Sequence, residues 1–135
     1  MKKLLLLLII ILTTKFVKAQ QLAVYHTNSV ITSTYNPKLK KWINDPETKV
    51  ELSIILNEST VYIDDANNSR YVIDNEVEER TEGDNLYFII KGFDKNKKSV
   101  LIILNKNTIT KKRTFSVHWM VGKEQRAVIY DIKEE

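Results

Sequence analysis

Short runs in which apolar and polar residues alternate constrain this fold more than any other feature of the sequence. The clearest run, residues 49–56, places aliphatic side chains at every second position: Val50, Leu52, Ile54 and Leu56. Alternation with a period of two is typical of a half-buried strand. Comparable runs are separated by clusters of Asn, Asp, Gly and Lys, and they cover residues 60–64, 70–74, 86–93, 100–104, 114–120 and 126–132. This pattern predicts successive antiparallel strands.

The order of these runs predicts an all-β fold, an up-and-down meander of about seven or eight strands. An initial strand is expected at residues 22–25 or 29–34. The meander is either closed into a small barrel or strongly coiled as an open sheet. Residues 86–93 and 100–104 are apolar at both alternating positions, which favours closure, and closure would also remove exposed strand edges. Six side chains near the end of the chain are expected to face inward: Phe115, Val117, Trp119, Val128, Tyr130 and Ile132.

One short helix is a possible exception, near residues 37–43. Asn36 can cap it, Pro37 suits the first helical position, and the Asp45-Pro46 pair would end it. The alternative is an extended segment in which Trp42 plugs one end of the sheet.

The first 19 residues have the three-part layout of a secretory signal peptide. Lys2 and Lys3 precede nine apolar residues at positions 4–12, and a more polar stretch leads to Val17-Lys18-Ala19. As a helix, this run would span only about 14 Å, against a hydrocarbon core of about 30 Å, so a stable membrane anchor is disfavoured. We therefore predict a helical signal peptide at residues 1–19, cleavage between Ala19 and Gln20, and one domain at residues 20–135, located in the periplasm or secreted.

The sequence contains no cysteine. A bacterial lipoprotein carries its lipid on a cysteine, so lipid anchoring is excluded, and so are disulfide bonds. The predicted domain must be held together by its core, and a chain of this size buries roughly 60–70% of its unfolded surface on folding.

Charge is balanced overall but unevenly distributed. Four of the 21 Lys and Arg residues lie in the predicted signal peptide, which leaves 17 to balance the 17 Asp and Glu residues. This balance gives no support for nucleic-acid binding. Residues 58–84 carry nine acidic against two basic side chains, whereas residues 91–113 carry eight basic against one acidic. These charges either cancel across neighbouring strands or form two exposed faces that meet charged partners.

The motifs of common enzyme classes are missing. There is no Gly-x-Ser-x-Gly elbow, phosphate-binding glycine loop or His-Glu-x-x-His sequence. Only His26 and His118 could serve as a base or a metal ligand, and a shared metal site would require the first and last strands to meet. We expect His118, between Val117 and Trp119, to be an ordinary packed or exposed histidine, and we predict no catalytic residue, metal or cofactor.

Two further features are weak candidates. Residues 64–68 and 75–85 contain several oxygen ligands but lack the spacing of a known calcium loop, so we interpret them as solvated turns. Lys111, Lys112 and Arg113 lie near Phe115 and Trp119 and form a candidate basic surface patch.

Several of these features together support a resemblance. They are the Lys18-Ala19-Gln20 end of the signal, Trp42, the strands at residues 50–56 and 61–63, Tyr71-Val72-Ile73, and residues 93–97 leading into 100–104. In this pattern the chain resembles the small exported all-β proteins of the Bacteroidetes lineage, whose function is uncharacterised, so the resemblance implies a compartment and a fold but no active residue. A similarity to lipocalin-type barrels fails because Lys41-Trp42 lacks a glycine two residues before the tryptophan.

We therefore predict an exported, non-enzymatic β domain that binds a small apolar ligand or a protein partner. The alternative is an enzyme that uses dispersed acidic residues and His118 on an unfamiliar scaffold. A small-ligand barrel requires an interior cavity, whereas a filled interior leaves a partner-binding surface.

Overall fold

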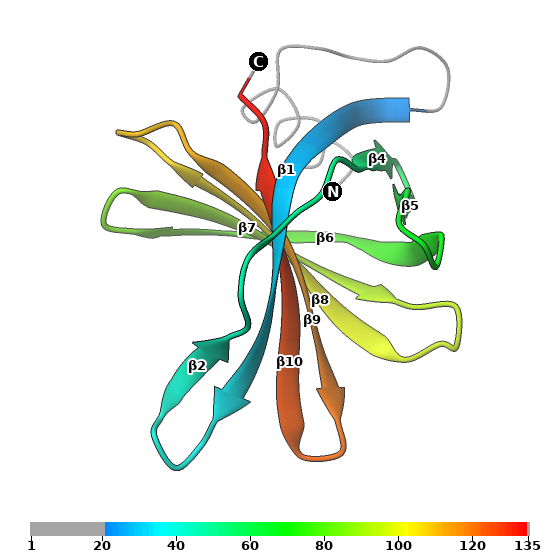
Figure 1. Cartoon of the computed structure of the whole chain (residues 1–135). Coiled ribbons are helices and arrows are strands. Elements are labelled where there is room, and N and C mark those ends of the chain that lie inside the picture. The colour runs from blue at the N-terminus through cyan, green and yellow to red at the C-terminus, as the bar shows by residue number, and fades with distance from the viewer. Residues whose placement is uncertain (1–20, 135) are drawn as a thin grey trace.

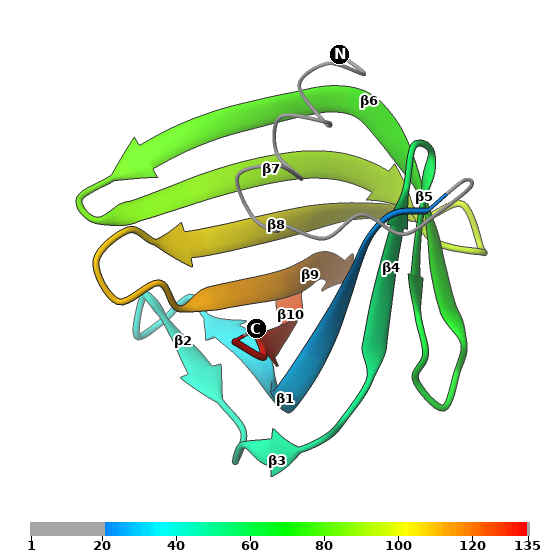
Figure 2. The same cartoon turned by 90° about the horizontal axis from the view of Figure 1, so that it is seen from above.

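The computed structural model describes residues 21–134, in which every regular element is a β-strand (Figures 1 and 2). The predicted signal peptide and the Ala19–Gln20 cleavage site lie outside the described residues. The strands are β1 (Gln21–Asn36), β2 (Lys41–Asn44), β3 (Thr48–Lys49), β4 (Ser53–Asn57), β5 (Thr60–Ile63), β6 (Ser69–Glu82), β7 (Asn85–Phe93), β8 (Ser99–Asn107), β9 (Arg113–Val121) and β10 (Glu124–Ile132). The all-β prediction is confirmed.

Eight of these strands form a closed antiparallel barrel. From β4 to β10 each strand pairs with the next along the chain, and β1 closes the ring by pairing with both β4 and β10. The short strands β2 and β3 also pair with β1, along the same edge as β4. The predicted meander is therefore a small barrel with two additional strands.

Strand β1 serves both sides of the closure because a bulge changes its register. Thr27 pairs with Ile132, but Ser29 already pairs with Asp131, so Asn28 is an extra residue on β1. One extra residue reverses which side chains face inward. Tyr25 and Thr27 are buried before the bulge, whereas Val30 packs against the core after it. The two predicted first strands are thus two halves of one strand.

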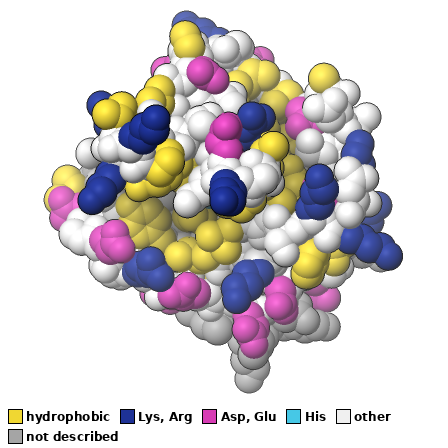
Figure 3. Space-filling view, turned by 90° about the horizontal axis from the view of Figure 1, so that it is seen from below, with side chains coloured by type: hydrophobic (Ala, Val, Ile, Leu, Met, Phe, Trp, Pro, Cys, Tyr) yellow, Lys and Arg dark blue, Asp and Glu magenta, His cyan; other side chains and the backbone are white. Residues whose placement is uncertain are grey.

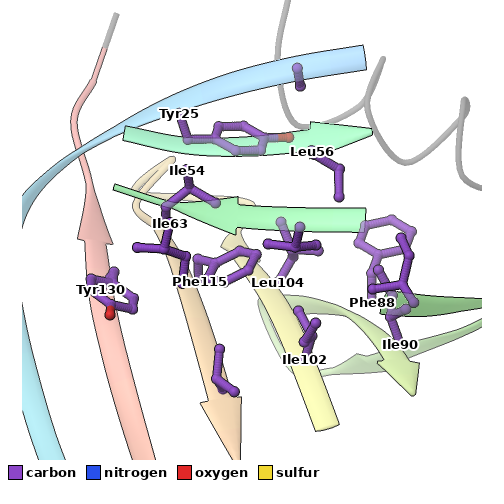
Figure 4. Close-up of a cluster of buried hydrophobic side chains, with 14 of the residues drawn as sticks. Tyr25, Ile54, Leu56, Ile63, Phe88, Ile90, Ile102, Leu104, Phe115 and Tyr130 are labelled. Atoms are coloured by element: carbon purple, nitrogen blue, oxygen red, sulfur yellow. The ribbon is translucent and has the colours of Figure 1, made fainter. Parts of the chain in front are cut away.

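The barrel interior contains a continuous cluster of buried hydrophobic side chains contributed by all eight strands (Figure 4). Phe115, Leu104 and Ile102 are at most 1% exposed, and the Phe115 and Tyr130 rings lie 6.5 Å apart. Burying an aliphatic or aromatic side chain of this size contributes about 1.5–3 kcal/mol. The predicted inward orientation of β9 and β10 is confirmed, because Phe115, Val117, Tyr130 and Ile132 are buried and Trp119 and Val128 pack against them.

The possible helix near residues 37–43 is not formed. The Asn36 side chain accepts hydrogen bonds from the backbone N–H groups of Lys38 and Leu39, as a cap would. Lys40 then adopts a left-handed conformation with φ of 53°, and the chain returns as β2 alongside β1. Pairing with β1 satisfies the backbone of residues 41–44 without a helix, so the segment is extended. The expected plug is not formed, because Trp42 is 39% exposed and its ring lies against His118.

Two other predicted boundaries need correction. Residues 49–56 do not form one strand: the chain leaves β3 at Lys49 and enters β4 at Ser53. Residues 75–82, interpreted as a polar loop, continue β6 as far as Glu82, because they pair with β7 after an irregularity between Ile73 and Val77.

The described residues contain no helix that could span a membrane.

Candidate functional site

Two open depressions stand out on the barrel. The first, which we call the Trp42 groove, has a volume of about 550 Å³ and is formed by β2, β6 and the four strands from β7 to β10. Its lining residues are Trp42, Asp74, Lys91, Gly92, Phe93, Ser99, Val100, Leu101, His118, Trp119, Met120, Gln125 and Arg126. The second is the Tyr25 cleft, which Tyr25, His26 and Arg113 help to line.

A row of directly paired residues runs along the Trp42 groove. Lys91 pairs with Leu101, and Leu101 pairs with His118, so the three side chains share one face of the sheet. Their neighbours along the chain at the alternating positions, such as Ile102 and Val117, belong to the buried core. This row therefore lies on the outer surface of the barrel.

Large apolar side chains in this groove reach solvent. Trp42 is 39% exposed, Phe93 47% and Met120 53%. Figure 3 views the molecule from the side on which the β1–β2 and β9–β10 hairpins project in Figure 1, and hydrophobic side chains gather there between charged ones. Exposed apolar side chains gathered in one place are typical of an interaction site.

His118 is held by two contacts at the groove. Its Nε2 atom lies 3.0 Å from Ser116 Oγ, and its ring meets the Trp42 indole edge-on at a centroid distance of 5.7 Å. Burial lowers the pKa of His118 below its ordinary value. The ring is therefore neutral at neutral pH and offers one hydrogen-bond donor and one acceptor.

The distance between Ser116 Oγ and His118 Nε2 would suit a nucleophile and its general base. The position of Ser116 in the sheet, however, indicates a structural role. Ser116 is only 7% exposed, and its hydroxyl group lies within hydrogen-bonding distance of the Ile103 carbonyl in the neighbouring strand. A hydroxyl group in this position is poorly placed to attack a substrate.

The second depression, the Tyr25 cleft, has a volume of about 540 Å³. It lies where β1 changes partner from β4 to β10, beside Lys133 and Glu134 at the end of the described chain. The guanidinium group of Arg113 lies 5.8 Å from the centroid of the Tyr25 ring and donates a hydrogen bond to the Lys133 carbonyl. The rim carries an ion pair between Lys133 and Glu51, so its charges are largely satisfied within the chain.

The predicted basic patch consists of Lys111, Lys112 and Arg113, whose side chains have different environments. Lys111 is exposed in the β8–β9 turn, and the Lys112 ammonium group lies 3.9 Å from the Asp131 carboxylate. Arg113 turns into the Tyr25 cleft. Arg113 is thus directed away from solvent while both lysines are exposed, and the basic patch stays a prediction.

The two histidines do not meet. His26 lines the Tyr25 cleft, where its Nδ1 atom lies 3.4 Å from Ser53 Oγ, whereas His118 lines the Trp42 groove. Within the described residues, no group of three or more His, Asp or Glu side chains is placed to hold a metal ion.

The two acidic segments are built into ordinary structure. The Asp65 carboxylate accepts hydrogen bonds from the backbone N–H groups of Asn67 and Ser69 and from the Ser69 hydroxyl, which closes the β5–β6 turn. The second acidic segment forms the end of β6 and the β6–β7 turn. Interpreting the first as a turn is therefore correct.

Comparison with known proteins gives no relatives. No protein-family model, curated protein or solved structure matches this chain significantly. The resemblance to exported Bacteroidetes proteins therefore stays a prediction.

The Trp42 groove was missed at the level of sequence, because its residues come from six strands. A signal was nevertheless present. Phe93, Leu101 and Met120 occupy positions that alternate with core residues, where a one-sided strand would carry polar side chains.

Proposed function

We propose that this protein is an exported, non-enzymatic binding module whose Trp42 groove accepts apolar side chains from an extended segment of a protein partner. The observation that carries this proposal is the exposure of Trp42, Phe93 and Met120 within one groove. Removing these side chains from water would supply the main driving force for binding.

A protein segment fits this groove better than a small apolar ligand does. Pockets for small molecules bury most of the ligand surface, commonly 70–90% or more. The Trp42 groove is open to solvent. It is lined by outward side chains and, at Val100 and Trp119, by the border of the core, while the interior holds packed side chains (Figure 4). An open groove covers one side of its occupant, which suits a segment that belongs to a larger partner.

Charged side chains surround the apolar part of the groove. Lys91 and Arg126 provide positive charge, and Asp74 provides negative charge at the β6 side. The Arg126 Nε atom lies 2.7 Å from a Glu124 carboxylate oxygen, so this guanidinium group already has one partner. An apolar centre with a charged rim is the usual arrangement of protein interfaces, and the rim would set the register of the bound segment.

The test is selection of displayed random peptides on the folded domain, followed by measurement of Kd for the selected peptides by calorimetry. We expect Trp42→Ala and Met120→Glu to weaken binding by at least about tenfold, equivalent to about 1.4 kcal/mol. Ile109→Glu is the matched control, because Ile109 is 69% exposed in the β8–β9 turn and is not part of the groove.

Two results would overturn the proposal. One is that the selected peptides bind the groove variants as tightly as the wild-type protein. The other is a stoichiometric small-molecule adduct in native mass spectra of the protein from its own source, which would indicate a ligand carrier. Circular dichroism of each variant establishes that a loss of binding is not a loss of folding.

A further inference from the structure

Barrel closure leaves several strand edges without a pairing partner in the described chain, and the edges of β2 and β6 are two of them. β2 pairs with β1 on one side, and its other side faces no described strand. β6 loses β5 as a neighbour after the hydrogen bond from the Ile73 N–H to the Ser59 carbonyl, and beyond that point it pairs with β7 alone. Figure 2 shows β6 along the upper border of the sheet and β2 at the opposite side of the molecule. The expectation that closure removes all exposed edges is wrong at these two places.

The two free edges carry opposite charges. Exposed lysines stand at the β1–β2 turn and the start of β2: Lys38, Lys40 and Lys41. The free part of β6 carries four exposed glutamates and one exposed arginine: Glu76, Glu78, Glu79, Glu82 and Arg80. Arg80 is paired with Glu78 on its own strand at 2.9 Å, so a clear negative excess remains.

Four ion pairs between described side chains leave the charge difference between residues 58–84 and 91–113 in place. These pairs join Arg80 to Glu78, Lys112 to Asp131, Arg126 to Glu124 and Lys133 to Glu51. None of the four connects the acidic stretch with the basic one. The acidic edge of β6 is therefore available to a positively charged partner.

We propose that the basic edge of β2 in one copy of this protein pairs with the acidic edge of β6 in a second copy. An unpaired edge presents a row of backbone donors and acceptors that another strand can extend. Pairing two β6 edges would oppose glutamates, and pairing two β2 edges would oppose lysines, both of which are unfavourable. Only the mixed pairing brings opposite charges together.

Charged residues on an edge often prevent association, and each edge alone fits that role. If the charges served only to prevent association, both edges could carry charges of the same sign. Here the two signs are segregated, and β2 adds the exposed apolar side chains of Trp42 and Ile43, the latter 45% exposed. The β2 edge therefore combines attraction for an acidic strand with apolar surface to bury against it.

The geometry of this contact determines the kind of assembly. Each copy carries one basic and one acidic edge, so the contact is head-to-tail and lengthens into a row of molecules unless the rotation happens to close a ring. The pairing segment is short, since β2 has four residues. We therefore expect weak association that depends on protein concentration and on salt.

The test measures the weight-average mass by sedimentation as a function of concentration, using residues 20–135, which contain every strand and the whole core described above. At low salt the mass should reach at least about twice the monomer mass at the highest concentration. At about 1 M salt, where the Debye length is about 3 Å, it should return towards the monomer.

Charge reversal makes the test specific. The β2 variant Lys38→Glu/Lys40→Glu/Lys41→Glu and the β6 variant Glu76→Lys/Glu78→Lys/Glu79→Lys should each remain monomeric, because each carries two edges of the same sign. An equimolar mixture of the two variants should associate again, because it restores opposite charges. Lys95→Glu/Lys97→Glu/Lys98→Glu in the β7–β8 turn is the control with the same change in charge, and it should associate like the wild type.

A wild-type protein that stays monomeric at low salt overturns the proposal, as does a reversed variant that associates like the wild type. Failure of the mixture to associate would also overturn it. Trp42 belongs to both the groove and the β2 edge, so Met120→Glu separates the two proposals: it should weaken peptide binding and leave association through the edges unchanged.

Discussion

The indole ring of Trp42 meets the imidazole ring of His118 edge-on, with an angle of 82° between their planes, although β1 and β10 lie between their strands in the sheet. Ser33 on β1 and Ala127 on β10 lie in the same cross-strand row as His118, and each is only 1% exposed. The ring pair thus covers small side chains on the outside of the barrel. A second, minor cluster stabilises the β1–β2 hairpin where the Trp42 groove begins.

The first prediction concerns the pH dependence of this cluster. Burial lowers the pKa of His118 in the folded protein, so below about pH 6.5 the unfolded chain binds more protons at this position than the folded protein does. The contribution of His118 to stability is therefore complete at neutral pH and is lost as the pH falls. We therefore expect the Tm of His118→Gln to fall less than the Tm of the wild type when the pH is lowered from about 7 to about 5.

His26→Gln is the matched control for this measurement. It removes the other histidine of the chain, which is exposed. Equal losses of Tm in the wild type and His118→Gln would contradict the assignment of this pH dependence to His118.

The second prediction concerns Thr27, which joins β1 to the segment between β3 and β4. Its fully buried hydroxyl donates to the Val50 carbonyl and accepts from the Leu52 N–H, both at 3.0 Å. Thr27→Val keeps the shape but leaves a backbone donor and acceptor unpaired, so the free energy of unfolding should fall by about 1–3 kcal/mol. Urea unfolding measures this change. Thr27→Ser keeps the hydroxyl and should be closer to the wild type; the reverse order of the two variants would refute the bridging role.

The strands from β7 to β10 could be predicted from sequence because their pattern is local. Each strand has nine residues, and the intervening turns contain Gly, Asn, Asp or Lys. In β9 and β10, apolar side chains recur at every second position from Phe115 to Trp119 and from Val128 to Ile132. Alternation places one set of side chains on the core side whichever strand is the neighbour. The inward residues of β9 and β10 therefore follow from the sequence alone.

Residues 37–43 show where such local reasoning ends. The Asn36 carboxamide accepts the same N–H hydrogen bonds in a hairpin turn as it would at the start of a short helix. The choice depends on pairing between Trp42 and Tyr35 across the hairpin, whose rings lie 5.6 Å apart. Such a contact is invisible in a segment examined alone.

The end of β6 was missed for a related reason. Its composition of Asn, Glu and Arg is typical of a solvated loop, yet pairing with the apolar strand β7 overrides that preference. The Trp42 groove depends on several such pairings together. It could be located only once the register of β7, β8 and β9 was known.

The third prediction concerns Gly92, which pairs with Ile73 where β6 becomes irregular. A Cβ atom on this residue would lie 2.9 Å from the Val72 carbonyl oxygen, which is backbone and cannot turn aside. Gly92→Ala should therefore reduce the free energy of unfolding by about 1–3 kcal/mol. Lys91→Ala, at the exposed neighbouring position, should change it by less than about 0.5 kcal/mol in the same denaturant titration. If Gly92→Ala left the free energy of unfolding unchanged, β6 and β7 would be able to move apart at this point at little cost.

The fourth prediction tests the filled interior. Leu104 is 1% exposed and packs in the cluster shown in Figure 4. Leu104→Ala should cost about 2–5 kcal/mol of stability, through lost burial and the cavity left behind. Ile109→Ala removes a similar side chain at a solvent-exposed turn and should cost less than about 0.5 kcal/mol. Comparable losses for the two variants would place the core elsewhere.

The last prediction separates the two neighbouring aspartates of the β5–β6 turn. The Asp65 carboxylate holds the turn through Asn67 and Ser69, whereas Asp64 is exposed and contributes its backbone N–H to the Ser53 carbonyl. Hydrogen bonds to a charged group contribute about 1.5–3 kcal/mol, so Asp65→Ala should destabilise the barrel by about that amount while Asp64→Ala leaves stability nearly unchanged.

Calcium addition to the wild type and to the Asp64→Ala and Asp65→Ala variants tests whether the β5–β6 turn binds this cation. Because the Asp65 oxygens are already engaged by N–H and O–H donors, adding calcium should shift the unfolding midpoint of neither the wild type nor Asp64→Ala. A calcium-dependent rise in Tm that disappears in Asp65→Ala would show that the carboxylate exchanges its hydrogen bonds for a cation. The interpretation of residues 64–68 as a purely structural turn would then have to be abandoned.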